Sequence, residues 1–571
     1  MTIHHSSSLV LSRRTFLGAA AGTALLFSGG CIAPPLTAQN GNTTDDIAAG
    51  EPDLTEITLT AGLDSVQILP GATTEVWRYQ GEVIQGDPST IQSIPGSYLG
   101  PILHLRQGQK VRVNLQNALA AATIIHWHGL IMPPAMDGHP ADSVASGGSY
   151  VYEFEVKNRA GTYWFHPHPH EDTAHQAYMG LAGLVLITDA EEAALALPTG
   201  AYDLPLVIQD RTFDADNQLV YLPGADQGHG GHHGGHNMGN APLENDPMAQ
   251  TMGFLGDRIL VNGVPDLVLP IATRIYRLRL LNGSNSRIYK LAWSNGAPLT
   301  VIATDGGLLA QPVERNYITL APGERVELWA DFSQLAVGDE VKLQSLAYSG
   351  VEAGMVMNGM LMQMEETATL PNGDPFDVLT LRVERAEAET LTLPTQLASL
   401  TRIDPTAVDN AASPRIFALG MSGGQWQING KPFIMAEVDE SEQVAFGTTE
   451  LWEFRNELAP ASDEHNAHAG HGQASGTPAE EEMVDFMAHP MHIHGVQFQI
   501  LKRQIDPAYE AGWRTLSEGF VDEGWKDTVL VMPGEQVQLG LRFVDYPGRY
   551  LVHCHNLEHE TGGMMRNFLI R

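Results

Sequence analysis

The sequence predicts an all-β protein made of three β-sandwich domains of one kind. One observation is that three segments, one in each third of the chain, share a glycine turn followed by alternating apolar and polar residues. Such alternation is typical of strands with one buried face. A second observation is that the other apolar runs are short, rich in Val, Ile and Leu and broken by Gly or Pro, while long helical periodicity is scarce. The repeated segments are LRQGQKVRV at 105–113, LAPGERVEL at 320–328 and VMPGEQVQL at 531–539, with glycines at Gly108, Gly323 and Gly534.

Length and composition agree with this organisation. A chain of 571 residues suggests about three or four domains, and its 58 Gly and 34 Pro indicate a globular protein rich in loops. The chain has 32 basic and 67 acidic residues, which gives a net charge of −35. Phosphate groups and anionic membrane surfaces repel so acidic a chain, so we expect no nucleic-acid partner.

The amino terminus predicts an export signal. The segment SRRTFL at 12–17 precedes an apolar run at 16–27, and this order is typical of a twin-arginine signal. We assign the signal to residues 1–38 and expect a periplasmic or extracellular protein. Cleavage near Ala38 would give a soluble protein, whereas cleavage before Cys31 would leave a lipid anchor. Ser28 stands where a lipoprotein signal prefers leucine, which favours the soluble form. No stretch is long enough to predict a transmembrane span.

Three domains are predicted after the signal, at 52–192, 200–388 and 412–571, with linkers at 189–202 and 385–413. The chain has two cysteines, Cys31 and Cys554. Because Cys31 belongs to the signal, a disulfide framework is excluded.

The placement of the 23 histidines is uneven, since none lies between Asn237 and Glu464. The first and third domains each carry a His-x-His-Gly segment and a later Gly-x-Tyr-x-x-His-x-His segment. A strand repeats its side-chain direction every two residues, so each pair points both imidazoles to one face. Imidazole binds copper, iron, zinc and nickel, and eight nitrogens exceed what one ion takes, so the pattern predicts a metal cluster between two domains. The eight residues are His126, His128, His166, His168, His492, His494, His553 and His555.

A second metal site is predicted around the remaining cysteine. If His553 and His555 face the cluster, Cys554 must face the other way. His489, His559 and Met564 complete the two-histidine, one-thiolate, one-thioether set of a blue-copper electron-transfer site. The alternative, that Cys554 is only a small buried apolar residue, does not explain these neighbours. Electrons entering at Cys554 would reach the cluster through the backbone, which suits a reaction that needs several electrons, such as the four-electron reduction of O2 to water.

At the level of these motifs, the chain resembles the multicopper oxidases, the family of laccases and bacterial cuprous oxidases. The segments HWHGL, YWFHPHPH, HPMHIHG and HCHNLEHETGGMM are similar to the four copper-binding segments of that family. The resemblance runs from about Glu56 to the C-terminus and implies three cupredoxin-like domains, which are Greek-key β-sandwiches, holding four copper ions. It implies a type 2 copper on His126 and His492, one type 3 copper on His128, His166 and His555, the other on His168, His494 and His553, and a type 1 copper on His489, Cys554, His559 and Met564.

The resemblance also implies roles for two acids. Asp137 matches the family acid beside the type 2 copper, and Glu560 matches an acid in the proton path to dioxygen. A buried carboxylate with a raised pKa can relay the protons that O2 reduction consumes. The alternative for Asp137 is an ordinary turn residue before Gly138. The histidines that fall outside the paired pattern are not expected to be ligands: His104, His139, His170 and His175.

The predicted function is an oxidase that couples four one-electron oxidations of a small donor, a phenol, an aromatic amine or Cu(I), to reduction of O2. The alternative is a periplasmic copper-sequestering protein of copper tolerance without turnover. A copper nitrite reductase would need fewer histidines and no His-Cys-His triplet. We expect a monomer. Met564 at the axial position implies a modest reduction potential for the type 1 copper.

A site for the electron donor is also predicted. Met421, Asp485 and Met487 resemble the substrate-copper site of bacterial cuprous oxidases, because thioether sulfur suits Cu(I) and a carboxylate adds charge attraction. The further methionines at 355–364 alternate around Asn358-Gly359, which predicts a hairpin instead. Two His-rich inserts at 228–240 and 461–482 are either solvated loops or a weak copper-collecting surface.

Overall fold

A computed structural model describes residues 54–222, 252–351, 354–357, 360–363, 368–422, 424–456 and 487–571. The predicted export signal, both His-rich inserts and Asp485 lie outside the described residues. Among the described residues, no helix is long and apolar enough to cross a membrane.

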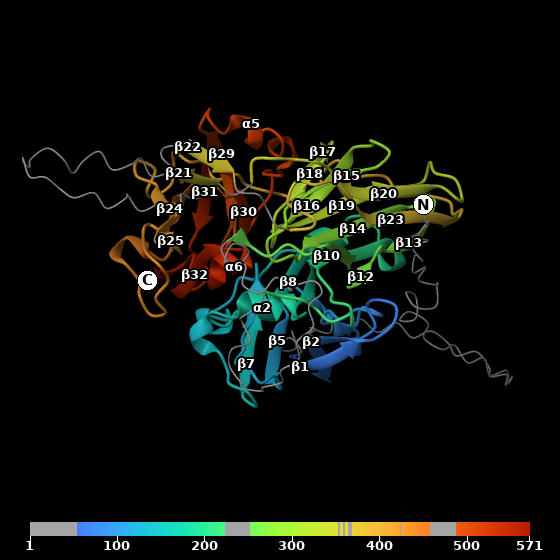
Figure 1. The fold of residues 1–571 in the computed structure, drawn as a ribbon, viewed down its shortest axis with the longest axis horizontal. Coiled ribbons are helices and arrows are strands. Elements are labelled where there is room, and N and C mark those ends of the chain that lie inside the picture. Colours follow the sequence, from blue (N-terminus) through green and yellow to red (C-terminus); the bar gives the residue numbers. More distant parts are fainter. Residues whose placement is uncertain are drawn as a thin grey trace, which may run out of the picture.

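The first sandwich is drawn in blue to cyan in Figure 1 and packs two sheets around one apolar core. One sheet has the order β2 (Thr74–Gln85), β1 (Thr55–Val66), β5 (Lys110–Asn117) and β7 (Ser149–Glu155). The other has the order β3 (Ile91–Gln92), β4 (Ile102–Arg106), β9 (Gly183–Thr188), β8 (Gly161–Pro167) and β6 (Ile125–His128).

The middle sandwich, green to yellow in Figure 1, encloses the next core. Its larger sheet has the order β12 (Val264–Pro265), β11 (Arg258–Val261), β10 (Asp203–Arg211), β14 (Ile275–Asn282), β19 (Arg325–Asp331), β16 (Leu299–Thr304) and β17 (Gly307–Arg315). Its other sheet has the order β13 (Val268–Ala272), β23 (Phe376–Arg385), β20 (Glu340–Ser345), β15 (Tyr289–Trp293) and β18 (Ile318–Leu320).

The third sandwich is mostly orange to red and lies beside the middle one. One sheet has the order β25 (Gln425–Ile428), β24 (Arg415–Ser422), β27 (Thr449–Arg455), β31 (Glu535–Arg542) and β29 (Phe498–Ile505). The other has the order β26 (Gln443–Val444), β33 (Met565–Ile570), β32 (Gly548–Cys554), β28 (His489–Ile493) and β30 (Thr528–Val531). The prediction of an all-β protein with three sandwiches of one kind is therefore confirmed.

The repeated glycine segments explain why the three sandwiches look alike. Gly108, Gly323 and Gly534 all have positive φ angles, of 81°, 84° and 71°, and each turn leads into a strand of its sheet, β5, β19 or β31. In each sandwich the first strand also pairs in parallel with a later one: β1 with β5, β10 with β14 and β24 with β27. One turn and one strand order thus recur in all three units.

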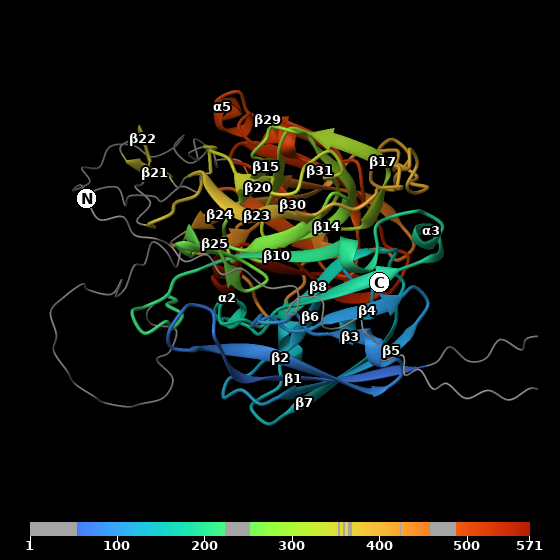
Figure 2. The same cartoon turned by 90° about the vertical axis from the view of Figure 1, so that its right-hand side faces the viewer.

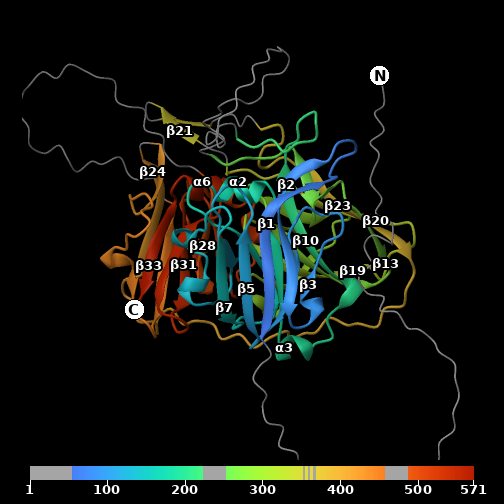
Figure 3. The ribbon, with the colours of Figure 1, turned by 90° about the horizontal axis from the view of Figure 1, so that it is seen from below.

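The described α-helices are short: α2 (Thr173–Tyr178), α3 (Ala190–Ala193), α5 (Glu510–Trp513) and α6 (Leu557–Thr561). Helices α2 and α6 contact each other where the sandwiches meet, and Figures 1 and 3 show them side by side there. Figure 2 shows α2 and strand β8 on the side of the first sandwich that faces the other two. The predicted methionine hairpin is confirmed, since β21 (Gly354–Met357) and β22 (Met360–Gln363) pair antiparallel with Met357 opposite Met360.

Candidate metal centre

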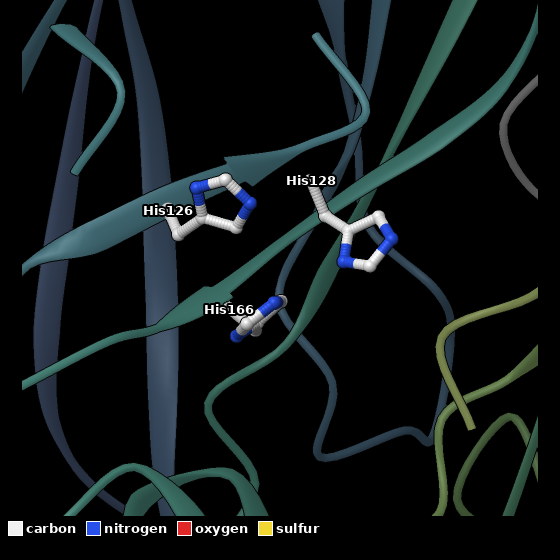
Figure 4. Close-up of side chains that lie close together, drawn as sticks. All are labelled: His126, His128 and His166. Atoms are coloured by element: carbon white, nitrogen blue, oxygen red, sulfur yellow. The ribbon is translucent and has the colours of Figure 1, made fainter. Parts of the chain in front are cut away.

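The eight paired histidines come from two strand pairs, one in each outer sandwich. In the first sandwich β6 pairs with β8, so that His126 lies opposite His166. In the third sandwich β28 pairs with β32, so that His492 lies opposite His553. All eight imidazoles are buried. Figure 4 shows His126, His128 and His166 around a common space, with ring centroids 5.4 to 5.8 Å apart.

The two outer sandwiches bring their histidines into direct contact, as the spacing predicts. Nε2 of His126 lies 3.3 Å from Nε2 of His492. Nε2 of His553 lies 3.0 Å from Nε2 of His494 and 3.5 Å from Nε2 of His168. The last three residues are the set that the resemblance implies for one type 3 copper, and their ligand atoms are close enough to share one ion.

The hydrogen bonds of these rings fit a bound cation. His126 Nδ1 donates to the carbonyl of Asp137 at 2.7 Å, and His492 Nδ1 donates to the carbonyl of Asp527 at 2.8 Å. His553 Nδ1 similarly donates to the carbonyl of Cys554 at 3.0 Å. Because carbonyl oxygens only accept, each neutral ring keeps its lone pair on Nε2. Facing lone pairs repel one another, and a metal ion between them removes the repulsion.

Burial keeps the imidazoles in the neutral form that metals require. Burial lowers the pKa of all eight histidines, to about 3 for His166 and about 4 for His553. Nε2 of His166 and both ring nitrogens of His555 have no hydrogen-bond partner in the part of the chain that the structure describes. Unpaired buried nitrogens are costly, so they support a ligand role.

His128 has an acidic neighbour that the sequence did not indicate. Its ring lies 4.9 Å from that of His555 and 5.7 Å from that of His166, so the rings of this expected set are neighbours, while its ligand atoms are close enough to share an ion with those of His126 and His166. However, its Nε2 faces the carboxylate of Asp527 at 2.9 Å. Sequence reasoning missed Asp527, whose only local signal is an acid directly before the apolar strand β30.

The cysteine site lies on the other side of β32. Sγ of Cys554 is 3.6 Å from Nδ1 of His489 and 3.5 Å from Nδ1 of His559, and all three side chains are fully buried. Cys554 packs in the core of the third sandwich with Met564, whose carbonyl accepts from the Cys554 N–H at 3.0 Å. The prediction that Cys554 and its neighbouring histidines face opposite ways is therefore confirmed.

Trp426, on β25, covers this site and was not predicted. Its ring centroid is 4.0 Å from that of His559 and 5.4 Å from that of His489, and only 3% of the residue is exposed. Of the predicted donor residues, Met421 is the cross-strand partner of Trp426, and Met487 is buried in the same core.

Both acids that the resemblance singles out contact cluster histidines. Oδ2 of Asp137 lies 2.7 Å from Nδ1 of His494. The oxygens of Glu560, on α6, lie 3.4 Å from Nε2 of His168 and 3.2 Å from Nδ1 of His553. Burial raises the pKa of Asp137 well above its usual range and that of Glu560 to about 8, so Glu560 can hold a proton near neutral pH.

The histidines outside the pattern have other partners. His139 bonds Asn567 at 2.8 Å, His104 bonds Gln92 at 3.0 Å and His175 bonds Asp172 at 3.0 Å. His170 stacks on Phe433. Among the described residues, none of these four belongs to a group that could hold a metal ion.

The described residues that flank the two inserts make specific hydrogen bonds. Tyr221 donates to Glu558 of α6 at 2.8 Å, and the carbonyl of Met252 accepts from Asn556 at 3.2 Å. On the other insert, Asn456 donates to the carbonyl of Met487 at 2.6 Å. The flanks of the first insert therefore contact the segment that follows Cys554, and the flanks of the second contact each other.

Comparison with known proteins gives consistent matches. Sequence models described as multicopper oxidase match residues 75–192 and 410–571. A laccase of Bacillus stratosphericus is 30% identical over 84% of this chain and 90% of its own length. The cell division protein FtsP of Escherichia coli is 32% identical over 78% of each chain. The crystal structure of the McoA multicopper oxidase of Aquifex aeolicus matches with a TM-score of 0.69 and 31% identity, over 91% of this chain and 97% of that one.

Proposed function

The chain belongs to the multicopper oxidase family, and we propose that it couples four one-electron oxidations of a small donor to the reduction of O2 to water. Family membership implies copper, and the donor atoms fit that metal, since neutral imidazoles and a thiol converge in buried sites and Met564 packs in the same core as the thiol. We assign one copper to His489, Cys554, His559 and Met564 and three to the eight-histidine cluster. When bound, copper would supply the one-electron redox chemistry and the binding of O2.

The observation that carries this proposal is the double role of the His553–His555 segment. Cys554 faces His489 and His559, while His553 and His555 on either side of it belong to the cluster. An electron at the thiolate therefore has a short covalent path to both cluster residues. A protein that only stores copper needs no such connection.

The two buried acids would manage the protons that O2 reduction consumes. Glu560 lies between His168 and His553, and Asp137 holds Nδ1 of His494. Burial raises the pKa of both carboxyl groups, to about 8 for Glu560, and a carboxyl group with a raised pKa can take up and give up a proton inside a buried site. We propose that Glu560, on α6, donates protons to the cluster and that Asp137 relays protons beside His126 and His494.

The proposed donor is Cu(I) or a small phenol or aromatic amine. Support for Cu(I) comes from two thioethers, since Met421 lies opposite Trp426 and Met487 belongs to the core that holds Cys554. The flanks of the first His-rich insert also contact the segment that follows Cys554. Support for organic donors comes from the similarity to a laccase. Steady-state O2 consumption with Cu(I), a phenol and Mn(II) as separate donors tests the proposal.

The triple change Met421→Leu, Asp485→Ala and Met487→Leu separates the donor classes. With a dedicated Cu(I) site, cuprous oxidation should fall steeply while oxidation of a bulky organic donor persists. Equal loss of both activities, or of neither, would contradict such a site.

A copper-sequestering protein without turnover is the competing function. One relative is a cell division protein, so a role other than substrate oxidation is tested as well. Copper binding without any O2 uptake on addition of a phenolic or aromatic diamine donor would support it.

We further propose export by the twin-arginine route, because SRRTFL at 12–17 precedes an apolar run.

A further inference from the structure

Arg325 of the middle sandwich lies where all three sandwiches meet. It opens β19 directly after the Gly323 turn, and it is fully buried. Its guanidinium uses all five N–H donors, which is the full capacity of the group. The acceptors are the carbonyls of Thr162 at 3.0 Å, Gly323 at 3.1 Å and Asp305 at 3.0 Å, and the two carboxylate oxygens of Asp527 at 2.7 and 2.6 Å.

Asp527 in turn holds one histidine from each outer sandwich. Its carbonyl accepts from Nδ1 of His492 at 2.8 Å, which turns Nε2 of that ring towards His126. Its carboxylate lies 2.9 Å from Nε2 of His128. The bidentate Arg325–Asp527 pair therefore fixes the backbone and the side chain that orient these two rings.

The pair sits in a closed ionic network of the middle and third sandwiches. Oδ1 of Asp305 accepts from the backbone N–H of Arg325 at 2.7 Å, and Oδ2 of Asp305 pairs with Lys526 at 2.9 Å. Lys526 also pairs with Glu324 at 3.1 Å. Because all of these groups are buried, loss of one cation leaves a carboxylate without compensation.

The copper-binding segments leave no spare room around this pair. A Cβ atom on Gly129, the glycine of HWHG, would lie 2.3 Å from Oδ2 of Asp527 and 2.7 Å from Nη2 of Arg325. The glycine that follows His128 is thus explained by the approach of the ion pair from the other two sandwiches.

We propose that Arg325 is a positioning residue that orients His492 and His128 for copper. The middle sandwich, whose described strands carry no histidine, thereby supports the cluster. This inference rests on the proposed copper function. It gives the middle sandwich a part in metal binding although its described strands contain no predicted copper ligand.

Copper titration of the full-length apo-protein tests the proposal, with Arg325→Met and Arg325→Lys as variants. Changes to residues that hold a metal-binding histidine in place weaken metal binding by about 10 to 100-fold, and we expect a loss of this size for the ion between His126 and His492. The readouts are copper content, competition with a chelator and the type 2 electron paramagnetic resonance signal. The intense absorption of the Cys554 site should persist. Arg325→Lys keeps the charge but cannot span both carboxylate oxygens, so its loss should be intermediate.

Arg277→Met is the matched control. Arg277 is also buried in the middle sandwich and paired with two acids, Glu192 and Glu327, none of them in contact with a cluster histidine. This control should lower the melting temperature without changing copper affinity. Wild-type affinity in folded Arg325 variants, or an equal copper loss in Arg277→Met, would overturn the inference.

Misfolding of a variant and copper loss in the wild-type protein have separate interpretations. If Arg325→Met does not fold, copper affinity is measured in Arg325→Lys and Asp527→Asn, which change less of the side chain. Weaker copper binding in both folded variants supports the inference, and wild-type affinity in both overturns it. Absence of copper from the wild-type cluster would overturn the proposed function itself, whereas a defect confined to the variants bears only on Arg325.

Discussion

The repeated glycine turn offers an internal comparison that isolates one contact with the cluster. Gly108 and Gly323 occupy equivalent turns with nearly equal φ angles, 81° and 84°. A Cβ atom on Gly108 would meet nothing within 4 Å. A Cβ atom on Gly323 would lie 3.0 Å from the ring of His555 and 3.1 Å from Cε1 of His128. The changes Gly108→Ala and Gly323→Ala therefore share the backbone cost and differ in the contact with two proposed ligands.

The expected magnitudes follow from these two terms. A non-glycine residue in the left-handed region costs about 1–2 kcal/mol. At about 2–4 °C per kcal/mol for a domain of this size, Gly108→Ala should lower the melting temperature by about 2–8 °C and leave copper binding unchanged. Gly323→Ala should lose more stability, since the rings must move by tenths of an ångström to restore ordinary contact. Copper at His128 and His555 should then bind at least about tenfold more weakly.

The assay is thermal unfolding of the apo-proteins together with copper titration of each variant. The difference between the variants, rather than either value alone, reports the contact with the rings. Equal melting temperatures and equal copper affinities in the two variants would refute the reasoning, because the cluster would then tolerate the added methyl group.

Three other predictions follow from the site. Cys554→Ser should abolish the intense thiolate-to-copper absorption and all turnover while the cluster keeps its copper; a visible spectrum and copper content check this, and retained colour would contradict the assignment. Glu560→Gln should slow O2 reduction but leave reduction of the Cys554 site by the donor nearly unchanged, as stopped-flow absorption can measure. The pKa of Glu560 is raised to about 8, so its carboxyl group is protonated below that pH. The rate of O2 reduction by the wild-type protein should therefore decline as pH rises through about 8, and the Glu560→Gln variant should not show this decline. Trp426→Leu should lower KM for bulky organic donors more than for small ones, because the indole ring covers His559 at 4.0 Å; unchanged KM ratios would show that donors approach elsewhere.

The sequence by itself determined the fold class and the pairing of the histidines. Alternation after three glycine turns predicted repeated sandwiches, because a strand with one buried face must alternate. The same two-residue period predicted that each His-x-His pair shares a face and that Cys554 turns away from His553 and His555. These are local consequences of strand geometry, so they needed no knowledge of the rest of the molecule.

Only the tertiary structure decided which groups support the site from a distance. Asp527 and Trp426 carry no motif, and the repeated segment that contains Arg325 indicates only a turn and a strand; all three reach the proposed copper ligands through contacts between strands far apart in the chain. The raised pKa values of Asp137 and Glu560 likewise depend on burial by several sandwiches at once. Side-chain periodicity sets the direction of a residue within its own strand, whereas packing between domains sets what that residue meets.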